Sequence, residues 1–380
     1  MVGQAFLPAS NQTGDRQECL PHQQRRPERT GINHIFDHIV VGQGIAGTTL
    51  AWCLRRRGLR VLVVDRNRRD GASHVAAGLV TPVTGKRLAK SWRWGELFPA
   101  ARDFYRSVER DTGTSLFHER PSLRLFASEA ERSEYLRRRE MLGELVRDAT
   151  NIPGCFAAPF GGLEMPHAAR LDVPAYLDAS REQFRAAGGF LAADLDPTRD
   201  VELRADGVRL PRLGVEARGL VFCRGFSVSD PWFGRVRFNA AKGEILTVRI
   251  PGLREERVVH RGVWLAPVGR ELYRCGATYA WDDLNNTPTA AGRAEIVSRL
   301  RELLRVPFEV LDHSAAVRPV VDAGYPVLGR HPDRPQLAYF NGLGSKGSLL
   351  APFFAEQLAA HLCGERDVEP ALDVRRFFAP

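Results

Sequence analysis

The residues whose spacing most clearly indicates chemistry are three glycines in the segment Gly-Gln-Gly-Ile-Ala-Gly. Gly42 allows a tight turn from a strand into a helix, Gly44 lets a pyrophosphate approach the backbone, and Gly47 lets the helix pack closely on the strand. The helix N-terminus offers free N–H groups to phosphate oxygens. Asp65, further along the chain, accepts hydrogen bonds from a ribose diol in such sites. This spacing predicts a dinucleotide site, and it leaves both FAD and NAD open.

The elements that must position this site are also visible in the sequence. Residues 39–41 are β-branched and predict a buried strand. Residues 48–57 carry apolar side chains at helical spacing, and residues 60–64 predict a second strand that ends in Asp65. The alternative, a glycine-rich turn that binds nothing, leaves this strand–helix–strand context unexplained. We therefore favour the binding interpretation.

The composition excludes several classes of protein. The chain has 380 residues, 44% hydrophobic and 26% charged, as in ordinary soluble globular proteins. No apolar run reaches the ~18 residues that a transmembrane helix needs. The N-terminus has no apolar core typical of a secretory signal, so we expect residues 1–35 to be a disordered extension or an over-long start. The six cysteines are scattered, which argues against a metal site and predicts a reducing, cytoplasmic location.

The net charge of +9 has more than one interpretation. Lysine occurs at only four positions, so arginine supplies nearly all of the basic charge. A basic excess is typical of proteins that bind nucleic acid, anionic membranes or acidic ligands. It also arises as a composition bias, in which scattered arginines pair with acids on a solvated surface. The scattered distribution favours the second interpretation.

Four later segments add a family resemblance. Residues 72–82 (Ala-Ser-His-Val-Ala-Ala-Gly-Leu-Val-Thr-Pro) are mostly small, so their backbone can pass close to a flat ring system. Residues 316–319 (Ala-Val-Arg-Pro) precede 325–332 (Tyr-Pro-Val-Leu-Gly-Arg-His-Pro), and residues 341–347 (Asn-Gly-Leu-Gly-Ser-Lys-Gly) open a helix. Together these segments resemble the glycine oxidase and D-amino-acid oxidase family of FAD-dependent oxidoreductases. The closing turn also resembles the oxidase domain of the bifunctional enzyme that makes 5-methylaminomethyl-2-thiouridine in tRNA.

The resemblance spans about residues 36–365 and implies an architecture. We expect an α/β protein with a doubly wound, Rossmann-like FAD-binding domain and an inserted substrate domain with an antiparallel sheet. The FAD-binding domain is predicted at 36–85, 160–235 and 310–380. The substrate domain is predicted at 86–159 and 236–309.

Two details qualify the resemblance. Relatives carry an Asp where this chain has Ala323, and whether the neighbouring Asp322 replaces it stays open. The Arg-Pro segment lacks the cysteine that anchors flavin in the sarcosine oxidases, so the FAD is expected to be noncovalent.

The resemblance also implies the chemistry. The substrate carbon that bears the amine transfers a hydride to flavin N5, and water hydrolyses the resulting imine. Arg318 is expected to bind a substrate carboxylate through its planar fork, and Lys346 to place positive charge beside the reduced flavin. His74 and Tyr279 are further catalytic candidates. The expected cofactor contacts are Gly42, Gly44, Ile45, Ala46, Gly47, Asp65, Arg66, Ala76, Ala77, Gly78, Gly225, Gly344, Ser345, Lys346 and Gly347.

The leading hypothesis is an enzyme that oxidises an amine or amino acid of the glycine, sarcosine or D-amino-acid type. Its partners are the small-molecule substrate and either oxygen or another electron acceptor. Two alternatives keep the flavin: oxidation of a modified tRNA wobble uridine, and a non-enzymatic flavin-binding protein. Nucleic acid is the less favoured partner because the basic clusters are short. The amine, the electron acceptor and the oligomeric state are left open.

Overall fold

The structure is a computed structural model that describes residues 36–226 and 230–378. The predicted extension at residues 1–35 lies outside the described residues. Within the described ranges, no helix combines the length and the apolar character needed to cross a membrane. In the same ranges, no group of three or more His, Cys, Asp or Glu side chains is placed to hold a metal ion.

The first large sheet is built on β1 (Phe36–Val41), which pairs in parallel with β2 (Val61–Asp65) and β14 (Val215–Phe222). Its strands are apolar on both faces, as expected for parallel strands covered on both sides. The strand order is β11-β2-β1-β14-β13-β12, with β21 pairing beside the second half of β14 and β20 beyond it. The remaining strands are β11 (Phe190–Ala192), β12 (Glu202–Arg204), β13 (Gly207–Leu210), β20 (Val327–Arg330) and β21 (Leu337–Asn341).

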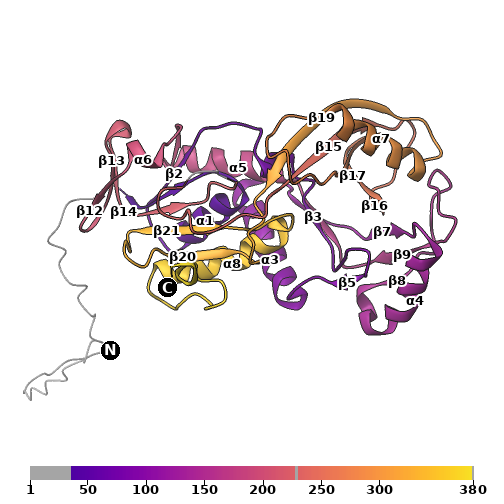
Figure 1. Ribbon diagram of the computed structural model, residues 1–380, viewed down its shortest axis with the longest axis horizontal. Helices are drawn as coiled ribbons and strands as arrows, with labels where there is room; N and C mark the ends of the chain where they lie inside the picture. The colour runs from indigo at the N-terminus through magenta and orange to yellow at the C-terminus, as the bar shows by residue number, and fades with distance from the viewer. Residues whose placement is uncertain (1–35, 227–229, 379–380) are drawn as a thin grey trace, which may run out of the picture. The chain divides into compact units, whose positions relative to one another are not determined.

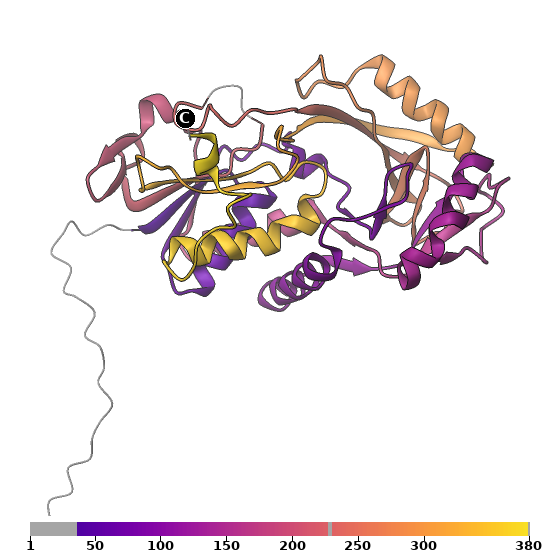
Figure 2. The same ribbon diagram turned by 60° about the horizontal axis from the view of Figure 1, so that its bottom comes forward.

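Helices cover one face of this sheet. Figure 1 shows α1 (Ile45–Arg56), α5 (Val173–Ala186) and α8 (Gly347–Leu362) around its strands, with α3 (Trp94–Thr112) nearby. Figure 2 shows the yellow α8 beside the indigo α1. Leu50, Tyr176 and Phe354 from three of these helices meet in one core. The short helices are α2 (Ala72–Val75) and α6 (Pro197–Asp200), with 3-10 turns at Gly143–Leu145, Pro211–Leu213 and Val374–Phe377.

The second large sheet is mostly antiparallel, with the order β19-β15-β18-β17-β16-β7-β9-β8. Helix α7 (Ala290–Leu303) packs Ile296 and Leu300 into the core of this sheet, and α4 (Glu129–Leu142) lies at its far end (Figure 1). Its strands are β7 (Ser122–Leu125), β8 (Arg147–Asp148), β9 (Gly162–Met165), β15 (Ala241–Arg249), β16 (Val258–Arg261), β17 (Val263–Gly269), β18 (Leu272–Gly276) and β19 (Glu309–Arg318). Two small sheets contain β3 (Leu79–Val80), β6 (Phe117–Glu119) and β10 (Ala169–Leu171), and β4 (Val83–Thr84) and β5 (Ala89–Lys90).

The predicted fold class is confirmed: a Rossmann-like α/β sheet with a parallel centre stands beside a largely antiparallel sheet. The predicted domain boundaries stay a proposal, and sheet membership refines two of them. Strand β9 pairs with β7, and β19 pairs with β15, so both belong to the second sheet. We therefore propose that the chain crosses between the domains after Met165 and at Arg318, rather than at 160 and 310.

Candidate active site

The glycine fingerprint folds as a turn in which side chains have no room. Gly42 has a φ of +102°, and a Cβ there would lie 2.5 Å from the carbonyl oxygen of Cys223. A Cβ on Gly47 would lie 1.9 Å from the carbonyl oxygen of Gly42. Gly44 is the N-cap of α1, so the free N–H groups of the helix follow it directly. The turn therefore presents bare backbone and a helix N-terminus to the cavity above it.

Asp65 holds this turn from the end of β2. Its Oδ2 accepts a hydrogen bond of 2.7 Å from the backbone N–H of Gln43, and its Oδ1 accepts one of 2.6 Å from that of Asn67. Each carboxylate oxygen has a second lone pair that remains available for a ribose hydroxyl. Asp65 is thus positioned by the backbone on both sides, and it lines the cavity.

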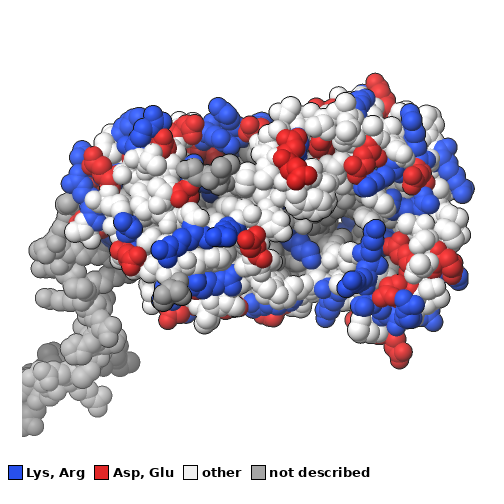
Figure 3. Space-filling view, viewed as in Figure 1, with Lys and Arg blue, Asp and Glu red and all other residues white. Residues whose placement is uncertain are grey.

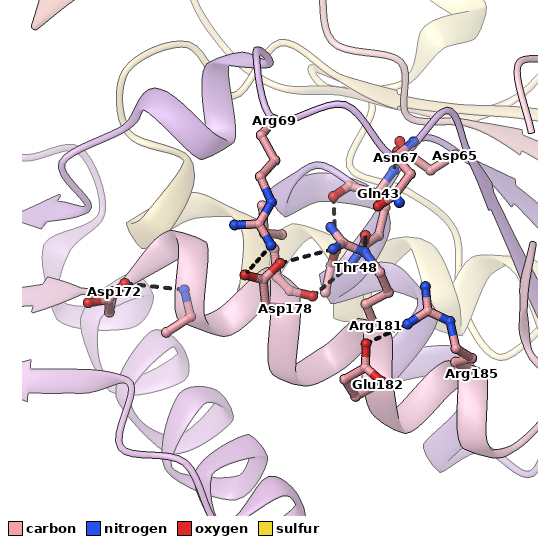
Figure 4. Close-up of polar contacts among 12 residues, drawn as sticks. Gln43, Thr48, Asp65, Asn67, Arg69, Asp172, Asp178, Arg181, Glu182 and Arg185 are labelled. Carbon is pink, nitrogen blue, oxygen red and sulfur yellow. Dashed lines mark hydrogen bonds and ion pairs between the residues drawn. The ribbon is translucent and has the colours of Figure 1, made fainter. Parts of the chain in front are cut away.

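A buried polar network ties the turn to α5, as Figure 4 shows. The side chain of Gln43, 1% exposed, donates through Nε2 to the carbonyl oxygen of Leu177 at 2.7 Å. Its Oε1 accepts from Nε of Arg181 at 2.7 Å. Asp178 accepts from both Arg181 and Arg69, at 2.9 and 3.0 Å. The network therefore holds the glycine fingerprint against α5, a helix that lies far from it along the chain.

The small-residue segment 72–82 runs along the same cavity. Ser73 Oγ accepts a hydrogen bond of 3.0 Å from the backbone N–H of Ile45, at the start of α1. Gly78 has a φ of +75°, and a Cβ there would lie 1.9 Å from the carbonyl oxygen of Leu171. Arg274 of β18 donates to the carbonyl oxygen of Ala76 at 3.0 Å. The segment is therefore held by α1, β10 and β18.

His74 in this segment has a buried Nε2 with no hydrogen-bond partner among the described residues. Burial lowers the pKa of its imidazole, and the charge of Arg181 lowers that pKa further. The other charged groups that act on it include Asp65 of the fingerprint turn and Asp178 of the network behind that turn. We therefore propose that His74 contacts the cofactor rather than the reacting atoms.

The closing turn brings the C-terminal helix to the fingerprint. Gly344 has a φ of +55°, and Lys346 is the N-cap of α8. A Cβ on Gly347 would lie 3.0 Å from Cγ2 of Ile45, so the N-termini of α8 and α1 converge. Lys346 is half-buried, and its Nζ lies 3.4 Å from Oγ1 of Thr84. Burial lowers the pKa of its ammonium group.

Arg318 ends β19 with a guanidinium that is half-buried and bound only to neutral groups. Nη1 donates to the carbonyl oxygen of Lys242 and Nη2 to that of Thr278, both at 3.3 Å. Its Cζ lies 4.1 Å from the ring centroid of Tyr279, a cation–π contact. Burial lowers the pKa of the guanidinium. Within 36–226 and 230–378, no carboxylate forms an ion pair with Arg318, so its charge is available to a ligand.

Space for this guanidinium comes from Gly243 on the neighbouring strand β15. A Cβ on Gly243 would lie 1.9 Å from Nη2 and 2.2 Å from Cζ of Arg318. Glycine inside a strand is typical where another group approaches the backbone closely.

One cavity of about 900 Å³ joins all these parts. Every predicted catalytic and cofactor-binding residue lines it except Gly47, which packs beneath the turn. Asp322 is exposed and does not line it. Figure 3 shows the surface hollowed, with basic and acidic side chains interspersed around it. Basic residues in the lining outnumber acidic ones: Arg66, Arg68, Arg124, Arg224, Arg299, Arg318 and Lys346 against Asp65, Asp70 and Asp194.

Comparison with known proteins identifies the family. Residues 37–361 match the model of the FAD dependent oxidoreductase family DAO. The chain belongs to this family. The oxidoreductase is 26% identical over 354 residues to glycine oxidase of Bacillus licheniformis, covering 87% of this chain and 93% of that protein. The crystal structure of glycine oxidase from Geobacillus kaustophilus superposes with a TM-score of 0.73 at 22% identity, covering 90% of this chain and 97% of that one.

A second group of relatives of the oxidoreductase is longer. It is 29% identical over 346 residues to the tRNA 5-methylaminomethyl-2-thiouridine biosynthesis bifunctional protein of Maricaulis maris. The match covers 86% of this chain and 52% of that protein, so this chain corresponds to about half of it. Both resemblances predicted from the sequence are thereby confirmed.

The residues of the oxidoreductase fit FAD, the cofactor of this family. Bare backbone at Gly42 and Gly44 lies beside the N-terminus of α1, as a diphosphate requires. Nη1 of Arg224 and Nε2 of His74 are buried without partners among the described residues and belong to cavity-lining side chains. Buried polar atoms normally find a hydrogen-bond partner, so these two indicate a polar ligand.

Sequence reasoning missed several residues that shape this site. Arg181 and Gln43 meet only through tertiary packing, and no local signal announces their contact. Gly243 had a signal, because a glycine inside an apolar strand marks a close approach. Arg224 had none, although it adjoins the predicted Gly225.

Proposed function

We propose that this FAD-dependent oxidoreductase oxidises a small amine that carries a carboxylate, of the glycine, sarcosine or D-amino-acid type. The observation that carries the proposal is the unpaired guanidinium of Arg318 in the cofactor cavity. Arg318 donates two of its five N–H groups to carbonyl oxygens, so three N–H groups and the positive charge remain for a planar anion. A substrate carboxylate bound to Arg318 fixes the position of the adjoining substrate atoms in the cavity.

Residues at different places in the cavity have different roles in the proposed reaction. FAD supplies the electron acceptor that turns the substrate C–N bond into an imine, which water then hydrolyses. Arg318 orients the substrate through its carboxylate. Lys346 and the N-terminus of α8 place positive charge at the closing turn, where it favours the anionic reduced cofactor. The cavity offers no carboxylate beside Arg318 within the described residues, which fits a reaction that needs orientation more than general base catalysis.

The test is a panel of amines added to the purified yellow protein without oxygen, followed by admission of air. Bleaching of the flavin absorbance by glycine, sarcosine, D-alanine or proline supports the proposal, and peroxide formation in air identifies oxygen as the acceptor. Arg318→Met should weaken the apparent affinity for a carboxylate substrate by about 10²–10³-fold, because two charge-assisted hydrogen bonds are lost.

Arg330→Met is a matched control for that variant. Arg330 is also half-buried and also donates to two carbonyl oxygens, those of Pro335 and Leu362, yet it lies outside the cavity. If both variants lower the affinity for the carboxylate substrate equally, the loss of affinity comes from a disturbed fold rather than from a lost carboxylate site. A colourless protein that takes up no FAD would contradict the proposal altogether.

Two observations favour a second candidate, oxidation of a modified tRNA wobble uridine. Basic residues outnumber acidic ones in the cavity lining, and the bifunctional tRNA proteins are among the relatives. Arg124 and Arg299 in that lining are paired with Glu131 and Glu295, which reduces the basic excess. Retention of unfractionated tRNA on a filter at 50 mM salt, and its loss at 200 mM, would favour this candidate over the first.

A further inference from the structure

The loop between β18 and α7 carries three exposed apolar side chains, of which two line the cavity and the third, Trp281, packs beside Tyr279. The exposed fraction is 52% for Tyr279, 57% for Trp281 and 38% for Leu284. Tyr279 and Leu284 line the cavity, and the ring centroids of Tyr279 and Trp281 lie 5.9 Å apart at 35°. We call these three residues the aromatic wall. Apolar side chains gathered beside a pocket are more informative than single exposed ones, because they mark a surface that a ligand covers.

The loop backbone is firmly held, so the exposure is built into the fold. Lys242, 1% exposed, donates through Nζ to Asp283 at 2.6 Å and to Asn285 at 3.1 Å. The backbone of Lys242 also forms an antiparallel bridge with Ala280. A buried cation that binds two loop side chains fixes the middle of the loop against β15.

Both ends of the loop are anchored as well. Oγ1 of Thr278 accepts from the backbone N–H of Glu244 at 3.0 Å, and the carboxylate of Glu244 accepts from the N–H of Thr289 at 2.9 Å. Nδ2 of Asn286 donates to the carbonyl oxygen of Asp70 at 2.9 Å, across to the cofactor-binding side. The loop therefore presents its aromatic side chains from a fixed frame.

The remaining exposed apolar residues of the described chain have no such position. Leu136 and Met141 lie on α4 and Leu311 on β19, and none of them lines the cavity. Tyr325 packs on Trp92, with ring centroids 4.7 Å apart. The aromatic wall is distinguished by its continuity with Arg318, whose guanidinium lies 4.1 Å from the ring centroid of Tyr279.

We propose that the oxidoreductase acts on an amino acid that carries an aromatic ring, which packs against Tyr279, Trp281 and Leu284. The proposal rests on the proposed function and adds a substrate class to it. A carboxylate on Arg318 brings the adjoining substrate atoms to the edge of Tyr279. Glycine and sarcosine are too short to extend beyond Tyr279. A ring attached at Cα or at the nitrogen of the substrate reaches the rest of the aromatic wall. A flat ring suits this surface because neighbouring aromatic rings pack in tilted and offset arrangements.

The test compares matched pairs of substrates by kcat/KM for flavin reduction: D-phenylalanine against D-alanine, and N-benzylglycine against sarcosine. The wild-type protein should favour the ring-bearing member of one pair by about tenfold or more, the factor that one aromatic contact contributes. The pair that shows this preference identifies the attachment point of the ring. Trp281→Ser should reduce the preference at least fivefold. Leu136→Ser, which replaces an exposed apolar residue on α4 outside the cavity lining, is the control and should leave the preference unchanged.

The outcomes separate this inference from the proposed function. If the small amino acids bleach the flavin but neither ring-bearing one is preferred, the ring inference is wrong and the proposed function stands. A preference that Trp281→Ser leaves intact also overturns the role of the wall. If neither these four amino acids nor glycine and proline reduce the flavin, the proposed function fails, and this inference fails with it.

Discussion

Replacing Gly243 by alanine adds a single methyl group, yet it should disturb substrate binding more than its size suggests. The added Cβ would lie 1.9 Å from Nη2 of Arg318, whereas ordinary contact begins at 3.4 Å. The guanidinium must therefore move by about 1.5 Å, which the flexible arginine side chain allows. The movement breaks hydrogen bonds of 3.3 Å to Lys242 and Thr278 and the contact of 4.1 Å with Tyr279.

The magnitude follows from the geometry of a carboxylate clamp. A charge-assisted hydrogen bond contributes about 1.5–3 kcal/mol, and a bidentate pair tolerates displacement of only about 0.5 Å. Moving the guanidinium by about 1.5 Å should therefore cost one of the two bonds, or about 2 kcal/mol. This corresponds to a decrease of about 30-fold in kcat/KM for a carboxylate substrate. Arg318→Met, which loses both bonds, should cost more.

The assay is stopped-flow reduction of the flavin by the best amino acid of the panel, and by the amine that lacks its carboxylate. Gly243→Ala should lower kcat/KM for the amino acid and leave kcat/KM for the simple amine unchanged. The FAD content of the variant should equal that of the wild type. Gly95→Ala is the control, because a Cβ there meets nothing within 4 Å. Equal kcat/KM values for Gly243→Ala and the wild type, within twofold, would refute the assignment of Arg318 as the carboxylate site.

Three further predictions concern the cofactor and the fold. Gln43→Leu removes the acceptor for Nε of Arg181, so the unfolding free energy measured by urea titration should fall by about 2–3 kcal/mol, and FAD should bind more weakly. Gln183→Leu, at an exposed position, is the control and should change the unfolding free energy little. Lys346→Met removes a positive charge at the closing turn, so the midpoint potential of the flavin should fall by roughly 30 mV in a dye-coupled reductive titration. Burial lowers the pKa of His38 from 6.5 to about 4, so the unfolded chain binds more protons between these values. The unfolding free energy should therefore fall by up to roughly 3 kcal/mol as the pH decreases from about 6.5 to about 4, and His38→Leu should flatten this part of the pH series.

The local elements were predictable because their ends carry recognisable residues. Helices α5 and α7 begin at Val173 and Ala290, each directly after a residue of a type that favours a helix N-cap. In both, the cap side chain accepts a backbone hydrogen bond, Asp172 from Ala175 and Thr289 from Gly292. Such caps act over three residues, so they can be recognised without tertiary information.

Strand partners were less predictable, because pairing depends on the whole fold. Nothing in residues 162–165 or 309–318 says which sheet they join, since strand propensity depends on the neighbours that a strand packs against. For the same reason the contact between Gln43 and Arg181, which are 138 residues apart, had no signal. The glycine fingerprint was predictable because its constraint is local: a Cβ at position 47 would meet the carbonyl oxygen of Gly42, five residues earlier.

The positive charge of the chain becomes informative only when its ion pairs are known. Near the cavity, Lys242 is paired with Asp283 and Arg124 with Glu131, so neither offers net charge to a ligand. Arg318 is held by two carbonyl oxygens and a tyrosine ring, which fix its position without neutralising it. Burial removes water from such a cation and raises its free energy as long as no anion is bound. A bound carboxylate lowers that free energy again, and this contributes to the affinity for the carboxylate. A carboxylate introduced beside it, as in Tyr279→Glu, should therefore weaken substrate binding by supplying the missing partner, and tighter binding in that variant would contradict this account.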